Sequence, residues 1–394
     1  MDYDGVTYLM TPDIAIVGIG ETPPVRRSDR DLRALVLDAV YAALDDAGIA
    51  PSEVDGIVTD SVVMPTTVPH DYVMAQLGAT SRFDGAISYG GAGIACAPLQ
   101  AALAINAGLA NVVVSYFGVD WGTRPSGPYG FHDLYPAKLE FEKPYGFNAQ
   151  PIYFGLWARR YMKEFGLTPK QLGAVAVQQR QHALLRDGAQ MTKPMSIEDY
   201  LNAPMIADPL RVPDCCLITD GAGAFVMTSR ERARDCRQSP VQVAGVGFQS
   251  IPVSGDSVFT QDPNILTTPA ARAAADQAFA MADIARSDID LVQIYDCFTI
   301  SVLMQLEDMG FCEKGEAGDF FEEGRAAIGG DLPVNTHGGF LSYSYRLGIE
   351  HVIETVRQLR GTAGGNQVSD ARIGAIGGFS LPDYGVLVLS GDDG

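Results

Sequence analysis

Two stretches of the chain share the same order of hydrophobic and polar positions. Residues 16–20 (Ile-Val-Gly-Ile-Gly) predict a strand that runs into a glycine turn, and residues 243–247 (Val-Ala-Gly-Val-Gly) repeat that pattern. Each stretch is followed by apolar residues at helical spacing, over about 31–47 in one case and 270–282 in the other. The pattern therefore predicts a strand with a covering helix twice in one chain.

The similarity continues after the two helices. Residues 47–58 and 282–293 each predict a short helical turn, which Ser52 or Ser287 can cap, and then a buried strand. Because the matches follow one another in the same order, we interpret them as an internal duplication rather than as chance.

The two halves also end alike, in glycine-led apolar strands over 220–227 and 383–389. Strands and helices alternate within each half, which is typical of a mixed sheet covered by helices. We therefore expect two similar α/β domains, 12–229 and 238–394, which pack pseudo-symmetrically and are joined by a charged connector over 230–237.

An insertion over about 118–210 has no counterpart in the second half. Residues 116–161 hold 13 of the 35 aromatic residues, and residues 124–193 hold ten Lys and Arg against five Asp and Glu. The insertion is either a solvated helical excursion or a lid that places cations beside an apolar cavity. A lid of that kind would suit a ligand with a phosphorylated end and an apolar end.

Composition and charge narrow the function classes. The formal net charge of −20 disfavours a nucleic-acid binder, because such a surface repels phosphates. No apolar run is long enough for a membrane span, and the acidic N-terminus lacks the pattern of a signal peptide, so we expect a cytoplasmic protein. The six cysteines form no CxxC pair and the five histidines are scattered, so we expect no metal site.

Two short segments of the sequence lie near the expected end of a strand and could carry catalytic groups. Residues 88–96 predict a glycine-rich strand-to-helix turn, in which Cys96 is expected to pack inside the helix. Further on, an apolar strand ends in Tyr295 and Asp296, the position at which α/β proteins place their sites. Alternatively, Tyr295 packs at the strand end with its hydroxyl bonded to backbone.

Two later strings add further candidates. Residues 335–348 (Asn-Thr-His-Gly-Gly-Phe-Leu-Ser-Tyr-Ser-Tyr-Arg-Leu-Gly) predict a glycine-containing loop followed by a helix from about Tyr345. Residues 373–380 predict a strand that runs into a double-glycine turn, whose backbone N–H groups could stabilise an oxyanion.

Together, the duplicated halves, the insertion and these four strings resemble the thiolase superfamily, specifically its sterol-carrier-protein-like branch. The resemblance covers nearly the whole chain. It implies a thiolase fold with two pseudo-symmetric βαβαβαββ halves, each a five-stranded mixed sheet with layered helices, and an inserted loop domain that holds coenzyme A.

The chain departs from the thiolase pattern at its catalytic positions. The nucleophilic cysteine falls on Gly90 or Gly91, and the second cysteine falls on Ala375. The first polar residue of the family's Asn-Glu-Ala-Phe or His-Asp-Cys-Phe string is Tyr295, and the histidine of its Gly-His-Pro string is Tyr345. Without a thiolate, no acyl-enzyme can form at these positions.

The tyrosine pair is similar to that of the steroid side-chain aldolases of actinobacterial sterol catabolism. This resemblance implies retro-aldol cleavage of a 17-hydroxy steroid acyl-CoA to a 17-ketosteroid and propionyl-CoA. Because the thiolase acid–base residues are missing at these positions, other side chains must transfer the protons. Our hypothesis makes Tyr345 the base and Tyr295 the proton donor, or the reverse. A helix N-terminus at Tyr345, or a relay through His337 or Asp296, would help to form a phenolate.

Several assignments stay open at this point. His337 is either a catalytic contact or a structural loop residue, and Asp296 either orients its neighbours or caps the next helix. Backbone contacts to the substrate are expected from four glycines: Gly338, Gly339, Gly377 and Gly378.

Other functions fit parts of the same sequence. The alternatives are a non-catalytic acyl-CoA or sterol carrier, a thiolase-type acyltransferase that uses Cys297 or Cys96, and a structural subunit. The resemblance further implies a homodimer formed near Val112–Phe117 and a separate OB-fold acyl-CoA-binding partner, as a heterotetramer. It implies no cofactor, because coenzyme A is part of the substrate.

Overall fold

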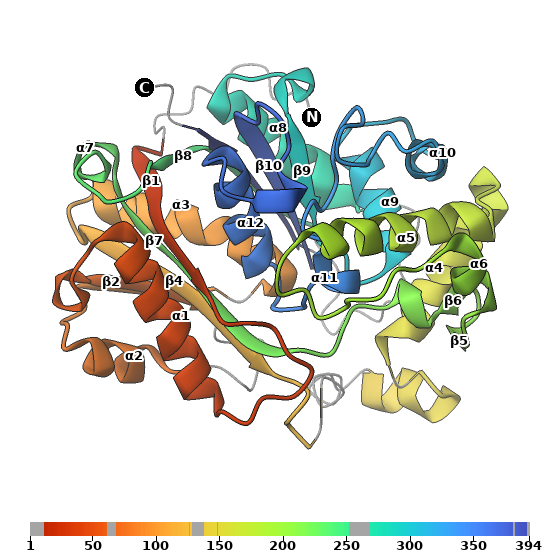
Figure 1. The fold of residues 1–394 in the computed structure, drawn as a ribbon, viewed down its shortest axis with the longest axis horizontal. Helices are drawn as coiled ribbons and strands as arrows, with labels where there is room; N and C mark the ends of the chain where they lie inside the picture. Colours follow the sequence, from red (N-terminus) through yellow and green to blue (C-terminus); the bar gives the residue numbers. More distant parts are fainter. Residues whose placement is uncertain are drawn as a thin grey trace.

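The computed structural model describes residues 12–60, 68–87, 89–125, 127, 138–147, 149–251, 268–380 and 383–391. Within these residues, a nine-stranded mixed sheet runs in the order β3-β2-β4-β7-β1-β8-β11-β10-β9 (Figure 1). Its strands are β1 (Ile14–Glu21), β2 (Gly56–Asp60), β3 (Phe83–Ile87), β4 (Val112–Asp120), β7 (Asp220–Ser229), β8 (Val241–Ser250), β9 (Leu291–Ile294), β10 (Ile373–Ser380) and β11 (Asp383–Ser390).

The sheet consists of two halves of the same design. The order β2-β4-β7-β1 in the first half corresponds to β9-β10-β11-β8 in the second, and β1 pairs antiparallel with β8 where the halves meet. In the described part of the second half, the place of β3 is taken by Val334, which forms a single parallel bridge to Val292 of β9. The described residues of the second half thus form four strands and a bridge where five strands were expected.

Helices cover the sheet in layers. On the first half, α1 (Leu32–Ala47) packs against β1, β4 and β7, and on the second, α8 (Pro269–Ala282) packs against β8 and β11. Between the halves, α3 (Gly93–Asn106) and α12 (Ile349–Leu359) contact strands of both (Figure 1). The shorter helices are α2 (His70–Leu77), α7 (Arg230–Ala233), α9 (Thr299–Asp308), α10 (Ala317–Glu322) and α11 (Gly339–Ser342). This arrangement confirms the expected layered α/β fold.

The repeated glycines have a packing role that differs from the prediction. Gly18 and Gly20 lie inside β1, and Gly245 and Gly247 lie inside β8, rather than in turns. A Cβ atom at Gly18 would lie 2.1 Å from a backbone oxygen of α1, and one at Gly247 would lie 1.8 Å from a backbone oxygen of α8. Glycine recurs in both halves because the covering helix approaches the strand too closely for any side chain.

The short turns after α1 and α8 also repeat, although not through the predicted serine caps. The carboxylate of Glu53 or Asp288 accepts the backbone N–H three residues earlier, at 2.9 and 2.8 Å. Ser52 and Ser287 lie inside these turns instead. The duplication therefore extends to individual hydrogen bonds, while the capping prediction was wrong about the residue.

The insertion forms a helical layer at one end of the molecule, beside α9, α10 and α11 (Figure 1). Its described elements include α4 (Gln150–Phe165), α5 (Pro169–Leu185), α6 (Ile197–Asn202) and a small hairpin of β5 (Met205–Ala207) and β6 (Leu210–Arg211). Among the described residues, ion pairs within the chain are formed by Arg124, Arg159, Arg160, Lys170 and Arg186. These ion pairs therefore connect parts of the insertion to one another and to neighbouring segments of the chain.

The sheet edge of the first half does not lie where the dimer contact was predicted. Val112–Phe117 belongs to β4, which is buried between β2 and β7, so that segment cannot form an edge. Strand β3 is the outer strand instead, and three of its five residues are exposed or partly exposed. In the described part of the chain, no helix combines the length and the hydrophobicity that crossing a membrane would require.

Candidate active site

Tyr295 is positioned by the end of a buried strand. It follows β9 directly, and its backbone N–H donates to the carbonyl oxygen of Gly377 in β10 at 3.0 Å. Its side chain is only 6% exposed and packs edge-on against Phe340, with ring centroids 4.9 Å apart. Strand pairing therefore fixes the backbone of Tyr295, and aromatic contacts fix its ring.

Tyr345 reaches the same place from the other side, out of the segment between α11 and α12. The predicted helix from Tyr345 is wrong, because α12 begins at Ile349, so no helix N-terminus acts on this phenol. The Tyr345 N–H donates to Thr219 Oγ1 at 3.0 Å. Its ring lies 4.6 Å from that of Trp121, at the start of the insertion.

The two phenol hydroxyls form a direct hydrogen bond to each other. Burial raises the pKa of both phenols well above the ordinary value, and the neighbouring Cys216 and Cys297 thiols raise the pKa of Tyr345 further. Both tyrosines are therefore neutral at physiological pH. The arrangement can pass a proton from one oxygen to the other, but it does not hold a standing phenolate.

A narrow crevice, too tight to hold a water molecule, lies beside Tyr295. It is lined by Gly91, Ala95, Tyr295, Gly348, His351, Ile376, Gly377 and Gly378. These residues come from α3 and the turn before it, from the start of α12 and from β10, so the crevice lies between the two halves of the sheet. The glycine-rich strings of the sequence thus converge with one of the two tyrosines.

Asp296 organises this region without touching the phenols. Its Oδ2 accepts the N–H groups of Phe340 (2.8 Å) and Leu341 (3.3 Å) at the start of α11. Its Oδ1 lies 3.4 Å from Nε2 of His351. These contacts match an orienting role and the capping of a helix, although the capped helix is α11 and not α9, which follows Asp296 in sequence.

His337 is buried next to the site but does not line the crevice. Its ring lies 5.2 Å from that of His351 and 5.3 Å from that of Tyr343, and neither of its nitrogens has a hydrogen-bond partner among the described residues. Burial and nearby cations lower its pKa well below the usual range, so the ring is neutral. The relay from His337 to the phenols thus has no hydrogen-bonded path in the described structure.

The four candidate glycines fall into two pairs. Gly338 and Gly339 have φ angles of +98° and +59°, and a Cβ atom at Gly339 would lie 2.1 Å from Asp296 Oδ2. Their conformation and packing require glycine whether or not a substrate is present. Gly377 and Gly378 line the crevice, but they lie within β10 rather than in the predicted turn. Their contact with a substrate stays a prediction.

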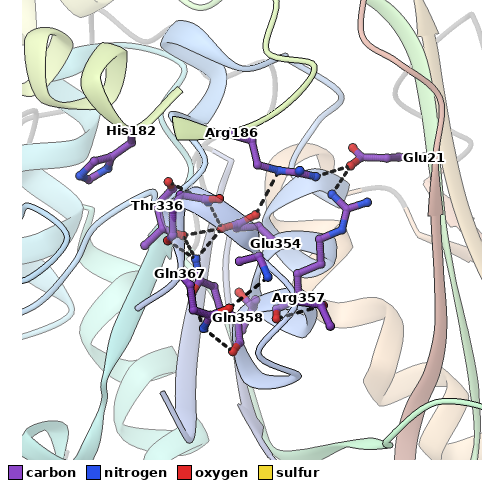
Figure 2. A network of polar contacts seen from close by, with 12 residues as sticks. Glu21, His182, Arg186, Thr336, Glu354, Arg357, Gln358 and Gln367 are labelled. Atoms are coloured by element: carbon purple, nitrogen blue, oxygen red, sulfur yellow. Dashed lines mark hydrogen bonds and ion pairs between the residues drawn. The ribbon is translucent and has the colours of Figure 1, made fainter. Parts of the chain in front are cut away.

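A buried ionic network holds the loop that carries Tyr345. The Arg346 guanidinium is fully buried and bonds to Glu21 at the end of β1, and Glu350 accepts the backbone N–H groups of Arg346 (2.7 Å) and Gly348 (3.1 Å). Figure 2 shows Arg186 and Arg357 converging on the same Glu21. The first half of the sheet thereby fixes a catalytic candidate of the second half.

Two of the buried cysteines lie in surroundings that disfavour a thiolate. Burial raises the pKa of Cys297, whose thiol contacts Ser301 Oγ at 3.7 Å, and raises that of Cys215 to about 12. Neither of these two is therefore an activated thiol. Cys96 is buried in α3, as predicted.

Two residues of the site were not among the sequence candidates. His351 lines the crevice from the first turn of α12, and Trp121 packs on Tyr345. The sequence carried only weak signals for either: His351 follows Tyr345 by six residues, and Trp121 belongs to the aromatic-rich insertion.

Comparisons with known proteins identify the family. A family model described as thiolase C-terminal domain-like matches residues 253–387. Together with the fold, this match defines a member of the thiolase superfamily.

Relatives that match nearly the whole chain identify a more specific family within the superfamily. The 17-hydroxy-3-oxo-4-pregnene-20-carboxyl-CoA lyase of Mycobacterium tuberculosis is 37% identical over 96% of this chain and all of its own length. The steroid side-chain-cleaving aldolase of Thermomonospora curvata is 36% identical over 96% of this chain and 98% of its own length. The solved structure of the Ltp2-ChsH2(DUF35) aldolase superposes with a TM-score of 0.90 at 35% identity, covering 98% of this chain and 100% of that one. The chain belongs to the family of steroid side-chain-cleaving aldolases.

Proposed function

We propose that the protein catalyses the retro-aldol cleavage of a 17-hydroxy steroid with a three-carbon side-chain CoA thioester, giving a 17-ketosteroid and propionyl-CoA. The observation that carries this proposal is the direct hydrogen bond between the Tyr295 and Tyr345 hydroxyls, beside a crevice at which the nucleophile position is glycine. The similarity to the mycobacterial lyase supports the same substrate class.

In the proposed reaction, Tyr345 accepts the proton of the substrate's β-hydroxyl. The carbon that bears this hydroxyl becomes the ketone, the Cα–Cβ bond breaks, and negative charge of enolate character develops on the thioester. Tyr295 donates its proton to Cα in the same concerted step. Because the two phenols share a hydrogen bond, the proton taken up by Tyr345 passes to Tyr295 and restores both side chains.

This relay explains how two phenols of raised pKa can serve as acid and base. A free phenolate would be disfavoured in the buried site. When each oxygen gains a proton as it loses one, neither phenol has to ionise. The raised pKa values therefore support a concerted transfer and weigh against the predicted phenolate intermediate.

Coenzyme A enters this scheme as part of the substrate, and the scheme uses neither another cofactor nor a metal. We further propose that a separate acyl-CoA-binding partner with an OB-fold completes the site. The name of the Ltp2-ChsH2(DUF35) aldolase supports a partner of the DUF35 type. The exposed outer strand β3 would suit a homodimer contact, because an unpaired strand edge can pair with a second copy. We place the assembly, a heterotetramer, in the cytoplasm.

The decisive experiment incubates the protein, alone and with a DUF35 partner, with a 17-hydroxy steroid acyl-CoA and measures propionyl-CoA. The control substrate lacks the 17-hydroxyl and should give no product. Release of propionyl-CoA together with a 17-ketosteroid supports the aldolase. Tight binding without cleavage in either mixture would instead favour the non-catalytic carrier.

A further inference from the structure

His351 combines deep burial with unused hydrogen-bonding capacity. It is 1% exposed, and neither of its ring nitrogens forms a hydrogen bond with the described residues. The facing oxygen, Asp296 Oδ1, lacks a hydrogen-bond partner in the same way, although it lies 3.4 Å from His351 Nε2. A buried polar group without a partner destabilises the fold, so such a pair calls for a ligand or another explanation.

The position of His351 relative to the crevice supplies that explanation. His351 lines the crevice together with Tyr295 and Gly91. Its ring stacks on Phe340, with centroids 4.4 Å apart, and the same Phe340 ring contacts both Tyr295 and Tyr345. A substrate group that widened the crevice beside Tyr295 would therefore meet this imidazole.

The surrounding contacts hold the ring in place. The two N–H groups at the start of α11 fix Asp296 through its Oδ2, which leaves Oδ1 for the imidazole. The His351 backbone N–H donates to Gly348 at 3.0 Å, in the turn that Glu350 anchors. A ring that carries a proton on each nitrogen would donate Nε2–H to Asp296 and Nδ1–H to a ligand.

We propose that His351 is a further catalytic residue, which donates a hydrogen bond to the thioester oxygen as negative charge develops on it. This inference deepens the proposed function and rests on it, because the retro-aldol step creates an enolate. Two tyrosines account for the proton transfers, but neither is left to stabilise the enolate oxygen. A preorganised donor in a buried site is an effective way to do so.

The test uses three variants and two reactions. His351→Leu removes the donor, His351→Asn keeps an N–H near the Nδ1 position, and His70→Leu is the matched control. His70 belongs to α2, contacts the ring of Tyr116 and does not line the crevice. The first reaction is steroid acyl-CoA cleavage, and the second is exchange of the α-protons of propionyl-CoA in D₂O, which needs an enolate but no carbon–carbon cleavage.

We expect His351→Leu to lower the kcat of cleavage and the exchange rate by about 10²-fold, with KM changed by less than about threefold, as for the loss of one oxyanion donor. His351→Asn should be at least about tenfold faster than His351→Leu in both reactions. His70→Leu should keep both wild-type rates. Rates of His351→Leu within about threefold of wild type would overturn the proposal. The proposal would also be overturned if the Leu and Asn variants lost the same activity and that loss followed their loss of thermal stability.

The two reactions separate this inference from the proposed function. If the wild type exchanges propionyl-CoA protons but does not cleave the steroid, the substrate assignment fails, while the exchange rates still decide the role of His351. If the wild type does neither, both proposals are wrong.

Discussion

The ring of Tyr295 occupies the space that a side chain at Gly91 would need. A Cβ atom at Gly91 would lie 2.3 Å from Tyr295 Cε2 and 2.3 Å from the carbonyl oxygen of Phe379. Gly90 and Gly91 are the positions at which the resemblance to thiolases places the nucleophilic cysteine. In this chain, the tyrosine and a nucleophile at residue 91 therefore exclude each other.

The first prediction follows from this contact. Gly91→Ala should displace the Tyr295 ring from Tyr345 and lower turnover by at least about 10²-fold, as expected when the acid–base groups separate. Turnover and the midpoint of thermal unfolding should be measured together. The control is Gly78→Ala at the C-cap of α2, where φ is +64° and no atom lies within 4 Å of the added Cβ. That variant should lose about 1 kcal/mol of stability and keep its activity. Normal turnover in Gly91→Ala would show that the ring can move without consequence.

The second prediction concerns the phenol hydroxyls. Tyr295→Phe and Tyr345→Phe should each keep the fold and acyl-CoA binding but lower kcat by at least about 10²-fold, because each breaks the proton relay. Activity would be measured as propionyl-CoA release, and binding by calorimetry with a substrate lacking the 17-hydroxyl.

A buried tyrosine outside the site controls for loss of stability. The Tyr200 hydroxyl donates to the Asp214 carboxylate at 2.9 Å in the insertion, so Tyr200→Phe should cost about 1–3 kcal/mol of stability and leave kcat unchanged. The assignment of the phenols is wrong if either of the two active-site variants turns over at the wild-type rate.

The sequence predicted the fold and pointed to Tyr295 because both leave local signals, whereas Tyr345 followed only from the resemblance to thiolases. Duplication appears as repeated patterns, and Tyr295 directly follows an apolar strand. The sequence could not show that Gly18 and Gly247 lie within strands, because only the approach of a helix distinguishes a packing glycine from a turn glycine. It also could not show that Tyr345 precedes α12 by four residues, since Arg346 fixes that loop through long-range contacts with Glu21 and Ala222.

The remaining site residues depend on tertiary structure in the same way. Asp296 caps α11, which begins more than 40 residues later, and no spacing rule connects the two. His351 was missed because a histidine in an amphipathic helix is ordinarily a packing residue. Only its position on the crevice, together with its unpaired nitrogens, distinguishes it.

The third prediction concerns the pH dependence of turnover. Burial raises the pKa of Tyr295 and of Tyr345 above the ordinary value of about 10, so neither phenol should ionise between pH 7 and 9.5. With the relay intact, kcat should not rise over this range. A mechanism that requires a phenolate would instead make kcat rise about tenfold per pH unit towards the pKa of the base. Such a rise in the pH–rate profile would refute the concerted transfer.

The last prediction concerns stability and His182, on α5. Its Nδ1 lies 3.2 Å from the carbonyl oxygen of Asn335, and its Nε2 accepts the N–H of Ile328 at 3.2 Å. Burial lowers its pKa to about 4, below the value of about 6.5 in the unfolded chain. The unfolded state therefore binds this proton first as the pH falls. The stabilisation is fully present above pH 6.5 and is lost between about pH 6.5 and 4.

Between pH 7.5 and 5, this one group should lower the free energy of unfolding by about 2 kcal/mol. Urea unfolding of the wild type and of His182→Gln at both pH values measures it. Glutamine can replace both hydrogen bonds without titrating, so the variant should be less stable at pH 7.5 but should lose less stability on acidification. If both proteins lose the same free energy of unfolding, another group takes up the proton. His182 then does not link the insertion to the active-site loop in the neutral form that its contacts with Asn335 and Ile328 require.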